Sequence, residues 1–146
     1  MVELLVVILI MAVLGLAIVP SLIGSADKSK YARAWSDLNG IFNAFVGLYG
    51  RKGTIPQFTV TGTDITSIVA TDLQSFLGTP IDKLYDPWGK PYQIESTWDG
   101  ATGCIIVYVK PDDDGENANF GSTVSARKDP YNEDAPMAKL IIDIPE

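Results

Sequence analysis

The sequence predicts an α+β protein in which a long N-terminal hydrophobic helix packs on a small C-terminal antiparallel sheet. Three observations predict this fold class. An almost unbroken apolar run covers 4–19, a helical stripe of large side chains follows to about residue 50, and strand-like segments are confined to the chain beyond about residue 92. Helix signals followed by strand signals, without alternation between them, are typical of α+β domains.

The first 26 residues form a hydrophobic segment that holds a single carboxylate, Glu3. As a helix, 4–19 is about 24 Å long, whereas crossing a bilayer takes about 20 apolar residues. An ionised carboxylate inside a bilayer costs about 2.5–3.5 kcal/mol, so we expect Glu3 to have a partner. This favours an assembly segment over a plain membrane anchor or a soluble core helix. A cleaved signal peptide is disfavoured because no Lys or Arg precedes the run.

The apolar period changes at about Asp27, where a helical stripe begins that predicts a helix over 27–50 with one face against a sheet. Pro20 must interrupt or bend the combined helix, because it removes a hydrogen bond and clashes with the preceding turn. Gly15 weakens the same region, and Gly50 and Gly53 fit a C-terminal stop. The stripe consists of Tyr31, Trp35, Leu38, Phe42, Phe45 and Tyr49.

The remainder, 51–146, is expected to hold the sheet and loops of one globular domain that spans 27–146. A loop is predicted over 53–62 and a short helix over 64–77, and a polar stretch covers 111–134. Strands are predicted at 92–95, 103–109 and 139–144, the last of them at a sheet edge. Asp99-Gly100 is a hairpin signal between the first two strands.

Composition excludes several classes of function. The net charge of −7 argues against nucleic acid as a partner, since phosphate binding needs basic patches. The chain has no His, the commonest general base. Cys104 has no second Cys to pair with, so we expect it to pack as a small hydrophobe in a strand. With no catalytic constellation in the sequence, we expect a protein that is not an enzyme.

The segment V-E-L-L-V-V-I-L-I-M-A-V-L-G at 2–15 resembles the N-terminus shared by type IV pilins and type II secretion pseudopilins. The resemblance implies removal of a leader, methylation of the new N-terminus, and a pilin-like fold. It places Glu3 at the family's glutamate and Pro20 at its helix-loosening proline, with Gly15 in the same assembly segment. The chain departs from the family pattern in having its glutamate third rather than fifth.

The segment D-P-W-G-K-P-Y at 86–92 resembles a signature of the major pseudopilins of type II secretion. This resemblance implies a structural subunit that polymerises into a helical filament. The subunit would cross the inner membrane once before assembly and then enter a periplasmic filament. Its implied partners are copies of itself, the assembly platform, and minor pseudopilins or pilins. Two alternatives stay open: a major type IV pilin of an extracellular pilus, and a monomeric membrane-anchored binding domain tethered by 1–23.

An acidic stretch at 112–119 contains closely spaced oxygen ligands around a Gly, which are the ingredients of a calcium loop. The candidate ligands are Asp112, Asp114, Asn117 and Asn119. The helix–loop–helix calcium pattern does not match, because no bidentate Glu stands at the required distance. A solvated acidic loop is the alternative. Major pseudopilins typically carry calcium in the loop after a strand of this kind, so the resemblance implies a calcium site here.

Overall fold

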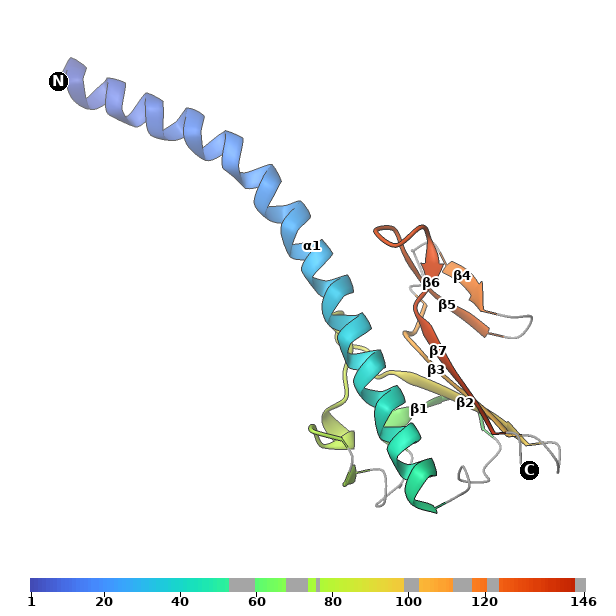
Figure 1. Cartoon of the computed structure of the whole chain (residues 1–146). Helices are drawn as coiled ribbons and strands as arrows, with labels where there is room; N and C mark the ends of the chain where they lie inside the picture. The colour runs from blue at the N-terminus through green and yellow to red at the C-terminus, as the bar shows by residue number, and fades with distance from the viewer. Residues whose placement is uncertain are drawn as a thin grey trace.

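The computed structural model describes residues 1–52, 60–67, 74–75, 77–98, 103–111, 117–120 and 124–143. One helix, α1 (Val2–Lys52), accounts for 51 residues. Its C-terminal half packs on the sheets, whereas its N-terminal half projects away from them (Figure 1). The fold class is therefore α+β, with an N-terminal helix on small antiparallel sheets, as the sequence predicts.

The main sheet has four antiparallel strands in the order β1-β2-β3-β7. They are β1 (Val60–Asp64), β2 (Gln93–Trp98), β3 (Gly103–Tyr108) and β7 (Ala138–Asp143). Three of these strands lie where the sequence predicts them. The last strand of the chain pairs with β3 and takes an edge position, which confirms that prediction as well.

A second sheet of three strands, β4 (Asn117–Phe120), β5 (Val124–Asp129) and β6 (Ala135–Pro136), continues from the end of the first. The backbone N–H of Arg127 in β5 donates to the carbonyl of Val109, just beyond β3, across 3.2 Å. The sequence shows only a polar stretch at 111–134, so strands β4 and β5 were not predicted. The main-chain hydrogen bonds that β5 makes with segments distant in the sequence leave no trace in a local apolar pattern.

Two predictions between α1 and β2 are wrong in part. Residues 60–62 belong to strand β1 rather than to a loop, and Asp64 ends that strand instead of starting a helix. Short 3-10 helices follow at Ile65–Ser67 and Ile81–Lys83. β1 contains Gly62 at φ +56° and a register shift against β2, so its local sequence resembles a turn although its backbone pairs in the sheet.

The core lies between the C-terminal half of α1 and the inner face of the main sheet. Leu38 and Phe45 of the predicted stripe are buried, and Tyr31, Trp35 and Phe42 pack against the core from its margin, which confirms that the stripe faces a sheet. The side chain of Tyr49 lies outside the described residues. The opposing side of the core is supplied by Tyr92, Ile94, Ile105, Val107, Val109 and Met137.

Helix α1 continues through Gly15 and Pro20 without a break, so an interruption at Pro20 is wrong for the single chain. The axis nevertheless changes direction along the protruding half (Figure 1). A proline in a helix removes one hydrogen bond and crowds the turn before it. A bend relieves that crowding, and the hydrogen bonds on both sides keep the rest of the helix intact.

Candidate functional site

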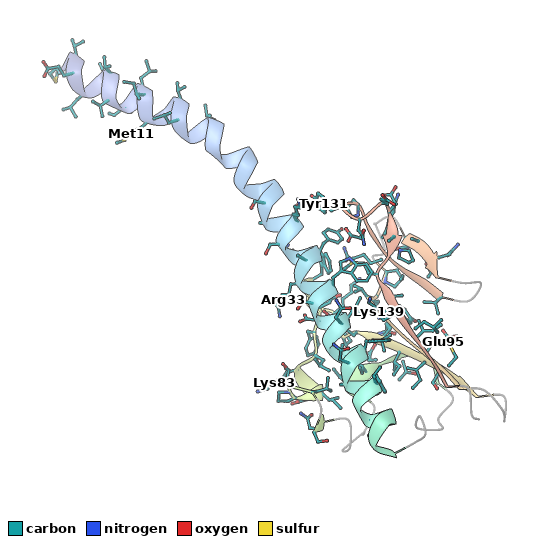
Figure 2. The ribbon with its side chains drawn as sticks, in the orientation of Figure 1. Met11, Arg33, Lys83, Glu95, Tyr131 and Lys139 are labelled. Atoms are coloured by element: carbon teal, nitrogen blue, oxygen red, sulfur yellow. The ribbon has the colours of Figure 1, made fainter. Side chains whose placement is uncertain are left out.

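Residues 1–16, at the far end of the protruding half of α1, form an exposed surface that is apolar apart from Glu3. Every residue from 1 to 16 is exposed, and Leu16 at the end of this stretch is 77 % exposed. Met11 lies far from the sheets in Figure 2. A monomeric soluble protein rarely exposes a continuous apolar surface of this kind, and such surfaces mark sites of protein or membrane contact. Within the part of the chain that the structure describes, no helix meets the length and hydropathy required to cross a membrane.

Glu3 lies in the first turn of α1 and is exposed. A carboxylate in the first turn interacts favourably with the free N–H groups and the positive end of the helix dipole. Glu3 therefore combines a charge with a surface that is otherwise apolar on all sides. Gly15 lies on the same stretch, and a methyl group added there would meet no heavy atom within 4 Å. The side chain of Pro20 lies outside the described residues.

The D-P-W-G-K-P-Y segment folds into a tight turn organised by Asp86. One carboxylate oxygen of Asp86, Oδ1, accepts hydrogen bonds from the backbone N–H of Trp88 at 2.9 Å and of Lys90 at 2.8 Å. The backbone of Asp86 also donates to the carbonyl of Lys90 at 2.8 Å. Gly89 adopts φ +84°, a conformation that favours glycine. The residue types of this segment are thus explained by the turn they build.

Trp88 is held between the helix and the second sheet. Its ring packs edge-on against the ring of Tyr31 in α1, with 4.9 Å between the two ring centroids. The Arg127 guanidinium stacks over the Trp88 ring, 3.8 Å from its centroid. Arg127 is only 5 % exposed, so this cation is largely removed from water, where an aromatic face attracts it more strongly than at the surface. Sequence reasoning missed Arg127, because no local pattern distinguishes it from a surface residue.

A second contact fixes the same face of α1. Trp35 donates its indole N–H to Asp129 Oδ2 at 2.5 Å, and Oδ1 of that carboxylate accepts from the backbone N–H of Tyr131 at 2.9 Å. Asp129 is 2 % exposed. Since a buried carboxylate requires hydrogen-bond donors, this pair ties the turn after β5 to the helix. The orientation of α1 against the sheets is therefore set by polar contacts as well as by the apolar core.

The outer face of the main sheet carries buried polar groups. Gln93 and Glu95 of β2 lie opposite Tyr108 and Ile106 of β3, and Gln93 donates to Asp64 of β1. Burial raises the pKa of Tyr108, and the charge of Glu95 raises it further. The same two causes raise the pKa of the Cys104 thiol. Cys104 is half-buried in β3, so its predicted strand position is confirmed, and a raised pKa disfavours the reactive thiolate.

The candidate calcium ligands are only partly placed. Asn117 and Asn119 lie two residues apart on β4 and are both exposed, so their side chains share one face of the strand. Asp112 and Asp114 lie outside the described residues. Lys90 Nζ donates to the carbonyl of Pro111 at 3.4 Å, immediately before the acidic stretch. Over the ranges that the structure describes, His, Cys, Asp and Glu residues form no group of three that could hold a metal ion.

The geometry defines a class of protein: an α+β subunit whose long N-terminal helix is buried against a small sheet at one end and bare at the other. A relative narrows the class. The chain is 33 % identical over an alignment of 111 residues to type II secretion system core protein G of Aeromonas hydrophila, and the match covers 73 % of this chain and 76 % of the relative. No protein-family model and no solved structure matches the chain. The chain belongs to the core protein G family of type II secretion systems, the major pseudopilins.

Proposed function

We propose that this chain is the structural subunit of a type II secretion pseudopilus, and that it polymerises through the bare half of α1 into a helical filament. One observation carries this proposal: residues 1–16 expose apolar side chains on every face of the helix. A helix that is hydrophobic all round requires burial, and copies of the same helix packed side by side supply it. The relationship to core protein G favours secretion over an extracellular pilus.

Glu3 would direct this assembly. As the bundle of helices forms, each Glu3 would meet the positively charged N-terminal amine of a neighbouring subunit. Both charges would be removed from water, so breaking the pair by removing one partner would leave a costly unpaired charge. Glu3 would therefore fix the position of each subunit along the filament axis relative to its neighbours. Contacts between apolar helix surfaces alone specify that position poorly. A monomeric tether would gain from Glu3 only its interaction with the helix dipole and would offer the charge no partner.

Before assembly, the segment 1–26 would hold the subunit in the inner membrane as a single span, with 27–146 in the periplasm. The apolar run 4–19 in the sequence supports this placement. Around Gly15 and Pro20 the helix would lose regular hydrogen bonding in the filament, because both residues weaken helical structure. Leader removal, N-terminal methylation, the assembly platform and the minor pseudopilins belong to the same proposal, as does a structural rather than catalytic role.

The proposal includes one calcium ion in the loop that follows β3. Only oxygen ligands are available in 112–119, and an all-oxygen set suits calcium rather than zinc or copper. Asn117 and Asn119 share the exposed face of β4, which supports the proposal that both amide oxygens bind one ion. The ion would neutralise three consecutive carboxylates at 112–114 and thereby order the loop.

The test is filament formation by Glu3→Leu, imaged by electron microscopy in cells that carry the whole secretion system. Membrane insertion is expected to stay intact while filaments disappear or shorten. Glu133→Leu is the matched control, because Glu133 is an exposed carboxylate on the turn after β5, and it should leave filaments unchanged. Filaments of normal length and number from Glu3→Leu would count against the proposal.

A further inference from the structure

The exposed side chains of helix α1 change from apolar to charged near the point where the helix leaves the sheets. Residues 24–30 are exposed, and the first residue of the helix stripe that packs against the core is Tyr31. No basic residue precedes position 28, yet three of the chain's 11 basic residues, Lys28, Lys30 and Arg33, fall between 28 and 33. Together with Asp27, this stretch carries a charge of +2 (three basic and one acidic residue) in a chain whose net charge is −7.

The acidic neighbours hold these cations only weakly. Lys30 Nζ lies 3.8 Å from Asp27 Oδ1, and Arg33 Nε lies 3.7 Å from Asp37 Oδ2. The side chains of Lys30 and Arg33 are 46 % and 66 % exposed. Exposed ion pairs of this kind contribute little free energy, so their cations can exchange a carboxylate for another anion at small cost.

An aromatic side chain from the far end of the sequence lies at the same level of the helix. Tyr131, in the turn after β5, is 53 % exposed, and its ring meets Tyr31 edge-on at 5.6 Å. In Figure 2, Tyr131 lies beside α1 at the end of the sheets nearest the protruding half. The turn also carries exposed Glu133 and Asp134, of which Asp134 pairs with Lys128 at 3.4 Å. At this level of the helix the exposed surface thus combines an aromatic ring from the turn with cations from α1.

We propose that Lys28, Lys30 and Tyr131 form a collar that docks the sheet-bearing domain on the headgroup layer of an anionic phospholipid bilayer before assembly. Tyrosine prefers the membrane–water interface, and lysines next to an apolar segment bind anionic headgroups while their stems cover apolar surface. The collar follows the apolar segment directly, which places it at the level of the headgroups. This inference rests on the proposed membrane segment and adds a contact for the domain outside it.

The experiment measures how far the domain approaches the lipid. The full chain, with Cys104→Ser and one new cysteine, is labelled with a fluorescent dye and reconstituted into vesicles of phosphatidylethanolamine and phosphatidylglycerol. The labelled sites are Asn132→Cys beside the collar, Lys83→Cys at an exposed position far from it (Figure 2), and Ile10→Cys in the apolar segment. Acrylamide, a neutral aqueous quencher, reports the exposure of each dye.

The dye at 132 should be quenched several-fold less than the dye at 83. Lys28→Gln with Lys30→Gln, or Tyr131→Ser, should raise quenching at 132 toward the value at 83, whereas Lys110→Gln, at an exposed lysine outside the collar, should not. Equal quenching at 132 and 83, with the dye at 10 shielded, would contradict the proposed collar but would agree with the proposed membrane segment. A dye at 10 that is quenched as strongly as the dye at 83 would overturn both.

Discussion

Tyr92 donates its phenolic hydrogen to Asp37 Oδ2 across 2.9 Å, and this bond joins the end of the D-P-W-G-K-P-Y segment to helix α1. Tyr92 is fully buried immediately before β2, whereas the side chain of Asp37 on helix α1 is 33 % exposed. This hydrogen bond fixes the position of the main sheet along the axis of helix α1. Any contact that sets this position also sets where the sheets lie relative to the bare half of α1.

Tyr92→Phe should lower the free energy of unfolding by about 1 kcal/mol, the usual net value of one hydrogen bond. The ring keeps its packing, and water can still reach Asp37, so the cost stays below that of a fully orphaned carboxylate. Denaturant unfolding of the full chain in mild detergent measures the change. Tyr85→Phe serves as the control because Tyr85 is 45 % exposed, and its effect should stay near zero. Equal effects of the two variants would contradict the role given to the Asp37 bond.

The same pair predicts a loss of stability at high pH. Burial raises the pKa of Tyr92, and the charge of Asp37 and its hydrogen bond raise it further. An unfolded tyrosine releases its proton near pH 10, while folded Tyr92 keeps it. Because the folded state then binds more protons, the contribution of Tyr92 to the free energy of unfolding is fully present below about pH 10 and is lost as the pH rises above it. Tyr92→Phe should flatten this decline, and a part should remain because the pKa of Tyr108 is raised as well. An unaltered slope in the variant would exclude Tyr92 as its source.

Two glycine substitutions should change stability in opposite directions. Gly89 has φ +84° in the turn, so Gly89→Ala should cost about 1 kcal/mol, the penalty of a left-handed conformation for a residue with a Cβ atom. Gly40 lies in α1, where an added methyl group meets nothing within 4 Å. Gly40→Ala should therefore stabilise the chain by about 0.5–1 kcal/mol. Thermal unfolding in detergent compares the two, and a shift of the same sign in both would refute this account.

The Trp35–Asp129 contact predicts a larger effect. Trp35→Phe removes the indole N–H and leaves one oxygen of a carboxylate that is 2 % exposed without its donor. Leaving a buried acceptor without its donor costs about 1–3 kcal/mol, and more when the group is charged. Trp35→Phe combined with Asp129→Asn should cost less than the sum of the single variants, since each removes the same contact. Additive effects in this double-mutant cycle would show that the two residues are not coupled.

The elements that could be predicted from the sequence are those whose pattern of apolar residues lies within the element itself. The stripe from Tyr31 to Phe45 and the apolar run at 103–109 are periodic patterns within one element, and both predicted the observed element correctly. β1 and β4 were not predicted. Val60-Thr-Gly-Thr-Asp64 and Asn117-Ala-Asn-Phe120 lack a strand pattern, and they are strands because β2 and β5 pair with them.

The residues of the candidate site also fall into two groups: those that the sequence pattern reveals and those that it does not. Glu3 stands out in the sequence as a charge in an apolar run, and the structure places it on a bare helix. Arg127 and Asp129 gave no such signal, because burial of a charged residue depends on partners distant in the chain: Trp88 for Arg127 and Trp35 for Asp129. The D-P-W-G-K-P-Y motif stands out in the sequence as well, but it does not reveal the Arg127 cation stacked on Trp88.

The last prediction concerns calcium. Three consecutive carboxylates, Asp112, Asp113 and Asp114, repel one another when a loop holds them in place, and a divalent cation removes that repulsion. An ion that binds only the folded chain stabilises it by about 2.7 kcal/mol when its concentration is a hundredfold above Kd. The full chain in detergent should therefore melt at a higher temperature in millimolar calcium than in chelator. Asp112→Ala or Asp114→Ala should abolish the difference, whereas Asp82→Ala, at an exposed carboxylate on a 3-10 helix far along the chain, should preserve it. Equal melting temperatures with calcium and with chelator, and no calcium found in the purified chain by elemental analysis, would leave a solvated acidic loop.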